Sequence, residues 1–192
     1  LIEFFGSRIF TINGQKIEVK NIIDNSILNS IQIESNSSII KTALNGHFLA
    51  ILTSSNEIYI FDISSFSIKP ISKLNIPNLD NYEKVTSIGI STGGFCVSVT
   101  FRSTKNQCKI ILISPSKSEN SKEIQKIIFF NEKGHLKWDT ETPNLFCIQT
   151  YENSLVTYLI DDDLKTVQLK TLSFSSELIL LKVSVPRYFY SP

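Results

Sequence analysis

The two histidines are the first candidates for chemistry, because an imidazole can bind a metal ion or exchange a proton near neutral pH. His47 and His135 each follow a glycine. They share no local spacing with each other, and no carboxylate accompanies both of them in the pattern of a catalytic or structural metal site. The sequence therefore predicts no metal site at either histidine.

The acidic run Asp161-Asp162-Asp163 is the second candidate, since carboxylate oxygens are the ligands that calcium prefers. A calcium loop of the EF-hand type needs alternating ligands, a central glycine and a distal glutamate, and this run has none of these. We interpret it as a solvated turn between two strands, at residues 156–160 and 165–172.

The three cysteines, Cys96, Cys108 and Cys147, are an odd number and are widely spaced. This argues against a disulfide framework and against a zinc knuckle, and it fits a reducing compartment. Cys96 and Cys147 lie inside apolar segments, where a free thiol acts as a small hydrophobe rather than a nucleophile. We find no glycine-rich phosphate loop either. The sequence predicts no catalytic, cofactor-binding or metal-binding residues, no cofactor, and a protein that is not an enzyme.

The composition is that of a globular protein, with 42% hydrophobic and 19% charged residues and a net charge of +1. This charge balance argues against nucleic acid as a partner, which needs a concentrated cationic surface. Lys117, Lys122 and Lys126 alternate with glutamates and predict a polar loop. No apolar run is long enough to span a bilayer, so direct membrane insertion is not expected. The chain contains no Met, and we expect it to be a fragment of a longer protein.

Short β-branched and aromatic segments, separated by Asn, Ser, Gly and Asp, run through the whole chain and predict strands and turns. Four hairpin-like segments align with one another, at residues 8–22, 44–64, 91–114 and 141–161. Equivalent positions in their second strands lie 41, 52 and 46 residues apart, namely Ile17, Ile58, Ile110 and Val156. A propeller blade of four strands takes about 40–45 residues.

The hairpins leave room for the other two strands of each blade. Residues 39–44, 85–90 and 135–138 fit inner strands, and residues 68–74 and 124–130 fit outer ones. We therefore predict an all-β fold of WD40-like β-propeller blades, each a four-stranded antiparallel sheet, forming a partial propeller of about four blades. The predicted blades are residues 1–38 (a partial N-terminal blade), 39–83, 84–132, and 133–192 (a final blade with a closing strand).

The dipeptide Trp138-Asp139 lies at an unusual place in this repeat. In a WD repeat, the Trp-Asp pair ends the third strand of a blade, and that position is held here by Phe61-Asp62. Trp138-Asp139 instead ends the first strand and enters the turn before the second. We predict that Trp138 packs between blades and that Asp139 supplies hydrogen bonds to the turn.

Three stretches, in this order, carry a resemblance to a known family: "NGHFLAILTSSNEIYIFDIS", "HLKWDTETPNLFCIQTYE" with its displaced Trp-Asp, and "ELILLKVSVPRYFYSP". Through them, residues 40–192 resemble the last blades of the second propeller in the family of the one-hundred-and-forty-kilodalton subunit of the intraflagellar transport A complex. In that family the third stretch closes the propeller. The first propeller and the helical-repeat solenoid of the family have no counterpart in this chain.

The resemblance implies a non-enzymatic scaffold that supports retrograde ciliary transport and ciliary cargo import through protein–protein interactions. It implies other subunits of the A complex as partners, membrane cargo as an indirect partner, and a location on the cytoplasmic side of the cilium or flagellum and its basal body. Two alternatives stay open: a WD-repeat propeller of another vesicle coat or recognition scaffold outside cilia, and an enzyme on a propeller scaffold.

Three further expectations concern packing. The core should include Phe48, Leu49, Ile51, Ile58, Ile60, Val97, Val99, Ile111, Phe146 and Ile148. Residues 75–83 and 114–122 should be exposed, mobile loops. A closed propeller of seven blades needs roughly 300 residues. The present chain should therefore expose a strand edge and apolar sheet faces, and the isolated chain should be poorly soluble or oligomeric.

Overall fold

The computed structural model describes residues 2–33, 37–64, 70–76, 82–103, 108–117, 123–130, 134–150, 152–161 and 164–175. Within these ranges the chain forms sixteen strands and no helix. The strands make four separate sheets of four strands, and every pairing in them is antiparallel. The predicted all-β fold is confirmed.

Each sheet is a meander of four strands that follow one another in the sequence. The first sheet comprises β1 (Ile2–Phe5), β2 (Arg8–Asn13), β3 (Lys16–Asn21) and β4 (Ile27–Gln32). The second comprises β5 (Ile39–Asn45), β6 (Phe48–Thr53), β7 (Glu57–Asp62) and β8 (Pro70–Asn75). The third comprises β9 (Tyr82–Ile90), β10 (Val97–Ser103), β11 (Cys108–Lys117) and β12 (Glu123–Phe130). The fourth comprises β13 (Gly134–Trp138), β14 (Leu145–Thr150), β15 (Ser154–Ile160) and β16 (Thr166–Ser173).

Asn-Gly pairs make the tight turns inside two of these sheets. Gly14 joins β2 to β3 with φ +60°, and Gly46 joins β5 to β6 with φ +56°. A positive φ is the conformation that hairpin turns require and that glycine adopts without a steric cost. The hairpins are therefore specified locally by the sequence.

The sheets stack face to face, and three hydrophobic clusters fill the spaces between successive sheets. Alternate residues of a strand point to opposite faces of its sheet. In β6, Leu49 and Ile51 pack toward the first sheet, whereas Leu52 packs toward the third. In β11, Ile111 packs toward the second sheet and Ile110 toward the fourth. This two-sided burial explains why the central strands read as nearly continuous apolar runs.

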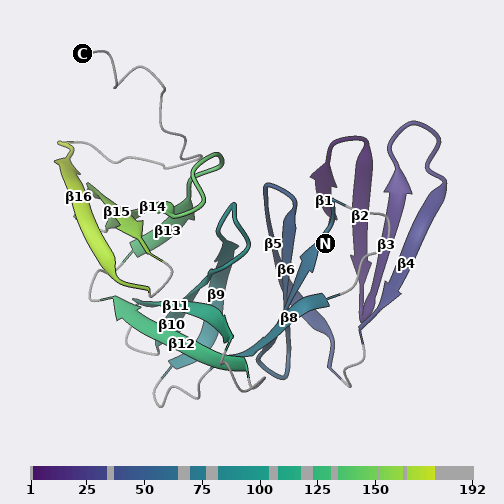
Figure 1. Ribbon diagram of the computed structural model, residues 1–192, viewed down its shortest axis with the longest axis horizontal. Coiled ribbons are helices and arrows are strands. Elements are labelled where there is room, and N and C mark those ends of the chain that lie inside the picture. The colour runs from purple at the N-terminus through teal and green to yellow at the C-terminus, as the bar shows by residue number, and fades with distance from the viewer. Residues whose placement is uncertain are drawn as a thin grey trace.

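The first strand of each sheet lies at the inner side of the stack, and these inner strands contact one another. Thr42 of β5 donates a hydrogen bond to the Glu3 carboxylate of β1 at 2.9 Å. Asn45, at the end of β5, donates to the carbonyl of Ile90 in β9 at 3.0 Å. In Figure 1 the four sheets follow one another in an open arc, with β1, β5, β9 and β13 on its concave side. This arrangement is that of a partial propeller of four blades, as predicted.

The central strand β3 is polar on the outward face of the first sheet, contrary to the expectation of an apolar face, although Ile27 and Leu28 of β4 are exposed. The Lys16 and Lys20 ammonium groups both contact the Glu18 carboxylate, at 2.6 and 3.2 Å. These three residues alternate with the buried Ile17 and Val19 along β3. The hydrogen bonds from the two lysines lower the pKa of Glu18.

Three further expectations require correction. The first sheet has four strands, so the N-terminal blade is not partial. Phe48 is half-buried, while the other nine predicted core residues are buried. The predicted loop at residues 114–122 begins too early, because β11 continues to Lys117 through pairs with β12 that include Ser114 with Lys126. Residues 118–122, 77–81 and the closing strand lie outside the described residues.

Candidate interaction surface

The candidate chemical groups lie apart from one another. His47 and His135 are both exposed, the first between β5 and β6 and the second on β13. The His47 ring lies 4.2 Å from the ring of the adjacent Phe48. Asp161 is exposed and its carboxylate accepts a hydrogen bond from the backbone of Lys165 at 2.8 Å, which closes a turn between β15 and β16. Asp162 and Asp163 are outside the described residues, as are the side chains of Lys117, Lys122 and Lys126.

Two of the cysteines are buried free thiols. Burial raises the pKa of Cys96 far above its ordinary value. Burial also raises the pKa of Cys147, against the opposing effect of its hydrogen-bonding contact with Thr157. A thiol with a raised pKa is a poor nucleophile at neutral pH, in keeping with the apolar surroundings predicted for both residues.

Neither a metal cluster nor a membrane-spanning helix occurs in the part of the chain that the structure describes. No three side chains of His, Cys, Asp or Glu there come close enough together to hold a metal ion. No helix there is long and apolar enough to cross a membrane.

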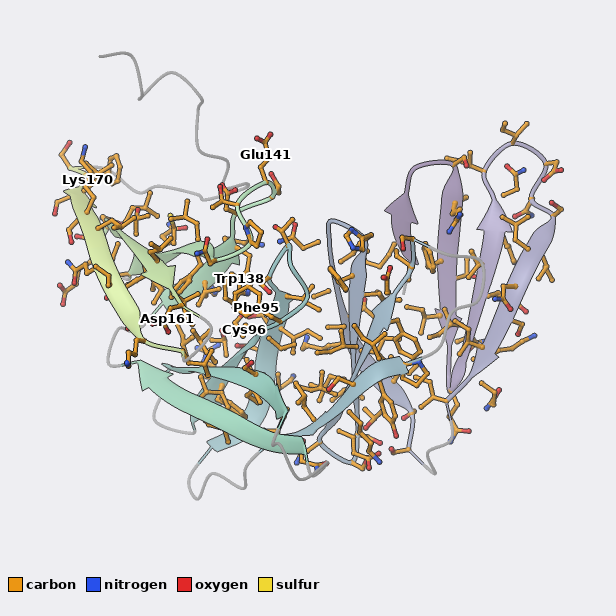
Figure 2. The ribbon with its side chains drawn as sticks, in the orientation of Figure 1. Phe95, Cys96, Trp138, Glu141, Asp161 and Lys170 are labelled. Atoms are coloured by element: carbon orange, nitrogen blue, oxygen red, sulfur yellow. The ribbon has the colours of Figure 1, made fainter. Side chains whose placement is uncertain are left out.

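Trp138 packs between two sheets, as predicted. Its indole Nε1 donates a hydrogen bond to the Ser98 hydroxyl of β10 at 3.0 Å, across the space between the fourth and third sheets. Its ring also lies 5.1 Å from the ring of Phe146 on β14. In Figure 2, Trp138 lies beside Phe95 and Cys96, which precede β10 in the third sheet. The displaced tryptophan therefore fixes the third blade to the fourth.

Asp139 is fully buried and organises the turn that follows Trp138. Its carboxylate accepts hydrogen bonds from the backbone amides of Glu141 and Thr142. Its carbonyl accepts two more, from the Thr92 hydroxyl and from the Asn45 amide. Asn45 ends the inner strand of the second sheet, and Thr92 and Asp139 follow the inner strands of the third and fourth, so the contacts join three blades at one point.

A groove of about 320 Å³ opens on the outer side of the stack, between the first and second sheets. Its lining comes from β4, from the residue that follows β4 and from the β7–β8 pair: Ile31, Gln32, Ile33, Tyr59, Phe61, Pro70 and Lys73. The Lys73 ammonium forms an ion pair with Glu57 at 2.5 Å and lies 5.3 Å from the centre of the Tyr59 ring. The hydrogen bond between this pair raises the pKa of Lys73 and lowers that of Glu57.

The groove residues were not predicted from the sequence. They lie about 30 to 40 positions apart on two different sheets, and neither segment carries a recognisable binding motif. The outer strands do carry exposed apolar residues, but none of these lines the groove: Ile27, Leu28, Ile71, Val167, Leu169 and Leu172.

Residues 2–114 match the family described as IFT140 second beta-propeller. The match covers more than half of the chain and includes the first two sheets together with β9, β10 and most of β11. The chain belongs to the IFT140 second beta-propeller family. The resemblance to this family is thereby confirmed; its hairpin segment lies within the match, whereas its Trp-Asp segment lies beyond residue 114. No curated protein sequence matches the chain.

Solved structures similar to this IFT140-type propeller chain include two bacterial proteins. One is a putative 6-phosphogluconolactonase from Bacteroides fragilis, with 10% identity, a TM-score of 0.58, and coverage of 90% of this chain and 54% of that one. The other is a putative 6-phosphogluconolactonase from Bacteroides uniformis, with 14% identity, a TM-score of 0.57, and coverage of 88% and 52%. The chain thus spans about half the length of these structures, and at such low identity the likeness concerns the fold alone.

Proposed function

We propose that the chain is part of a non-enzymatic propeller scaffold of the intraflagellar transport A complex. In this role it supports retrograde ciliary transport and ciliary cargo import through protein–protein interactions. Its partners are other subunits of the complex and, through them, membrane cargo. It acts at the cilium or flagellum and the basal body, on the cytoplasmic side.

The family match over residues 2–114 is the observation that carries this proposal. The construction of the stack is consistent with it, because hydrogen bonds and continuous hydrophobic clusters join each sheet to the next. Such a rigid body presents loops and strand edges at fixed positions, which is what a scaffold requires. We also propose blade boundaries after residues 38, 83 and 132; the first and the last fall between successive sheets, and the second lies next to the start of β9 at Tyr82.

Affinity purification of the full-length protein from ciliated cells, followed by mass spectrometry, tests the proposal. We expect the other subunits of the A complex at near-stoichiometric amounts. Recovery of subunits of a different coat complex would instead favour the propeller of a scaffold outside cilia. Loss of the protein should also cause retrograde cargo to accumulate at the ciliary tip, and normal tip composition would contradict the transport role.

A further inference from the structure

The groove between the first two sheets lies beside an open strand edge. β4 is the last strand in its sheet, and it pairs with β3 on one side only. No described strand lies along its other side. An edge of this kind offers backbone donors and acceptors to any extended segment that lies beside it.

The pairing of β4 with β3 shows which backbone N–H and C=O groups of β4 face the open edge. The Ile33 amide donates to the Gln15 carbonyl at 3.0 Å, so the backbone of residue 33 faces β3. Because the direction of hydrogen bonding alternates along an antiparallel strand, the N–H and C=O of Gln32 face away from β3, toward the open edge. The side chains of Ile31 and Ile33 pack toward the second sheet. A strand added along β4 would therefore direct every second side chain into the groove.

The lining indicates which side chains the groove fits. Tyr59 and Phe61 provide an apolar wall, which suits a bulky aliphatic side chain. The Lys73 ammonium is paired with Glu57, but 48% of the Lys73 side chain is exposed compared with 22% for Glu57, so the ammonium can also contact a carboxylate that arrives from solvent. Neither β4 nor β8 contains an acidic residue. The mouth of the groove therefore favours a carboxylate near Lys73.

We propose that the groove binds an extended segment of a partner protein, which pairs with β4 as a fifth strand of the first sheet. One aliphatic side chain of the segment fills the groove, and an acidic side chain two residues away lies beside Lys73. This inference rests on the proposed scaffold function, since it assigns a partner-binding surface to that scaffold.

The test uses a fluorescein-labelled peptide, Gly-Thr-Leu-Thr-Asp-Thr-Gly, whose binding to the full chain is followed by fluorescence anisotropy. In an extended peptide the Leu and Asp side chains lie on the same face. Gln32→Pro removes the outward N–H of β4 and leaves the buried side chains unchanged, and it should weaken binding at least about tenfold. Gln32→Thr keeps this N–H and is the comparison variant, and it should bind the peptide more tightly than Gln32→Pro. Equal binding by the two variants would overturn the proposal.

A charge exchange provides a second test that does not depend on the folding of the proline variant. Lys73→Glu should weaken binding of the Asp peptide by about two- to fivefold, as expected for an exposed ion pair. A peptide with Lys in place of Asp should show the opposite preference and bind Lys73→Glu more tightly than wild type. If Lys73→Glu changes neither affinity, the groove does not hold the acidic side chain and the proposal is wrong.

The two proposals fail in different ways. If the full-length protein purifies with the A complex while wild type and Gln32→Pro bind the peptide equally, the groove proposal fails and the scaffold function stands. If the peptide binds with the predicted pattern and no subunit of the A complex is recovered, the scaffold function fails and the groove stands.

Discussion

The indole of Trp138 and the hydroxyl of Ser98 form a 3.0 Å hydrogen bond across the space between the third and fourth sheets. The bond is possible because residue 89, the partner of Ser98 in the adjacent strand β9, is a glycine. A Cβ at position 89 would lie 2.7 Å from Ser98 Oγ and 3.1 Å from Trp138 Cδ1. The absence of a side chain in one blade thus lets the tryptophan of the next blade approach.

Gly89→Ala should destabilise the chain by about 1–3 kcal/mol, because the added methyl group overpacks this contact. The free energy of unfolding, measured by urea titration, should decrease accordingly. Ser98→Ala removes the crowded Oγ and serves as the second arm of a double-mutant cycle. The double variant should be more stable than the sum of the two single effects predicts, with a coupling of about 0.5–3 kcal/mol. Strict additivity would contradict the contact.

The fold was predictable where local signals and the long-range structure agree. The Asn-Gly turns at Gly14 and Gly46 specify hairpins by themselves, and the repeat spacing then identifies the blades. In strand β11 the local composition and the long-range pairing disagree. Ser114, Pro115 and Ser116 have the composition of a loop, yet they pair with β12, and the Ser114 hydroxyl donates to the carbonyl of Phe95 at 2.8 Å.

The candidate site could not be predicted for a different reason. Ile31 and Lys73 approach the same groove only because two sheets pack against each other, and no local pattern encodes that contact. Likewise, the sequence predicted the turn hydrogen bonds of Asp139 but not the donation from Asn45, which comes from a blade two positions away. Hydrogen bonds within one strand or turn can be predicted from the sequence, whereas contacts between blades cannot.

Replacement of Asn45 tests the junction of the three blades. Its amide nitrogen donates to the carbonyls of Ile90 and Asp139, each at 3.0 Å. Asn45→Ala removes both hydrogen bonds and should cost about 1–3 kcal/mol. Asn45→Asp has nearly the same shape but places a carboxylate against two carbonyl oxygens, so it should be less stable than the alanine variant. Thermal unfolding at pH 7 compares the two, and greater stability of Asn45→Asp would contradict the assigned donor.

Phe146 is fully buried between the third and fourth sheets, with its ring 5.3 Å from that of Tyr158 and 5.1 Å from that of Trp138. Phe146→Ala should cost about 3–5 kcal/mol, since it leaves a cavity in the cluster. Ile23→Ala is the matched control, because Ile23 is 86% exposed and its loss should change stability by less than about 0.5 kcal/mol. Equal melting temperatures for the two variants would argue against the packing.

The buried thiol of Cys96 predicts a dependence of stability on pH. Burial raises its pKa above the ordinary value of 9.0, so the folded thiol stays protonated where the unfolded thiol ionises. Below pH 9, ionisation of this thiol therefore does not lower the free energy of unfolding. At higher pH the free energy of unfolding decreases by at most about 1.4 kcal/mol per pH unit, because the thiol ionises in the unfolded chain only. Cys96→Ala should show a weaker loss of stability between pH 8 and 10 than the wild type. Iodoacetamide at pH 8 should label Cys96 only after urea is added, and rapid labelling of the native protein would contradict the burial.

The outer strand of the fourth sheet predicts self-association of the isolated chain. Val167 and Leu169 on β16 are 58% and 54% exposed, and the far side of β16 pairs with no described strand. Exposed apolar residues on an open strand edge favour pairing between copies of a chain. We therefore expect light scattering to give a mass above that of the monomer, and the double variant Val167→Lys/Leu169→Lys to lower it, because charged edge residues oppose strand pairing. Ile23→Lys adds charge at an exposed apolar residue outside the strands and should leave the mass unchanged. A monomeric wild type at micromolar concentrations, or an equal effect of the control, would show that this edge does not drive association.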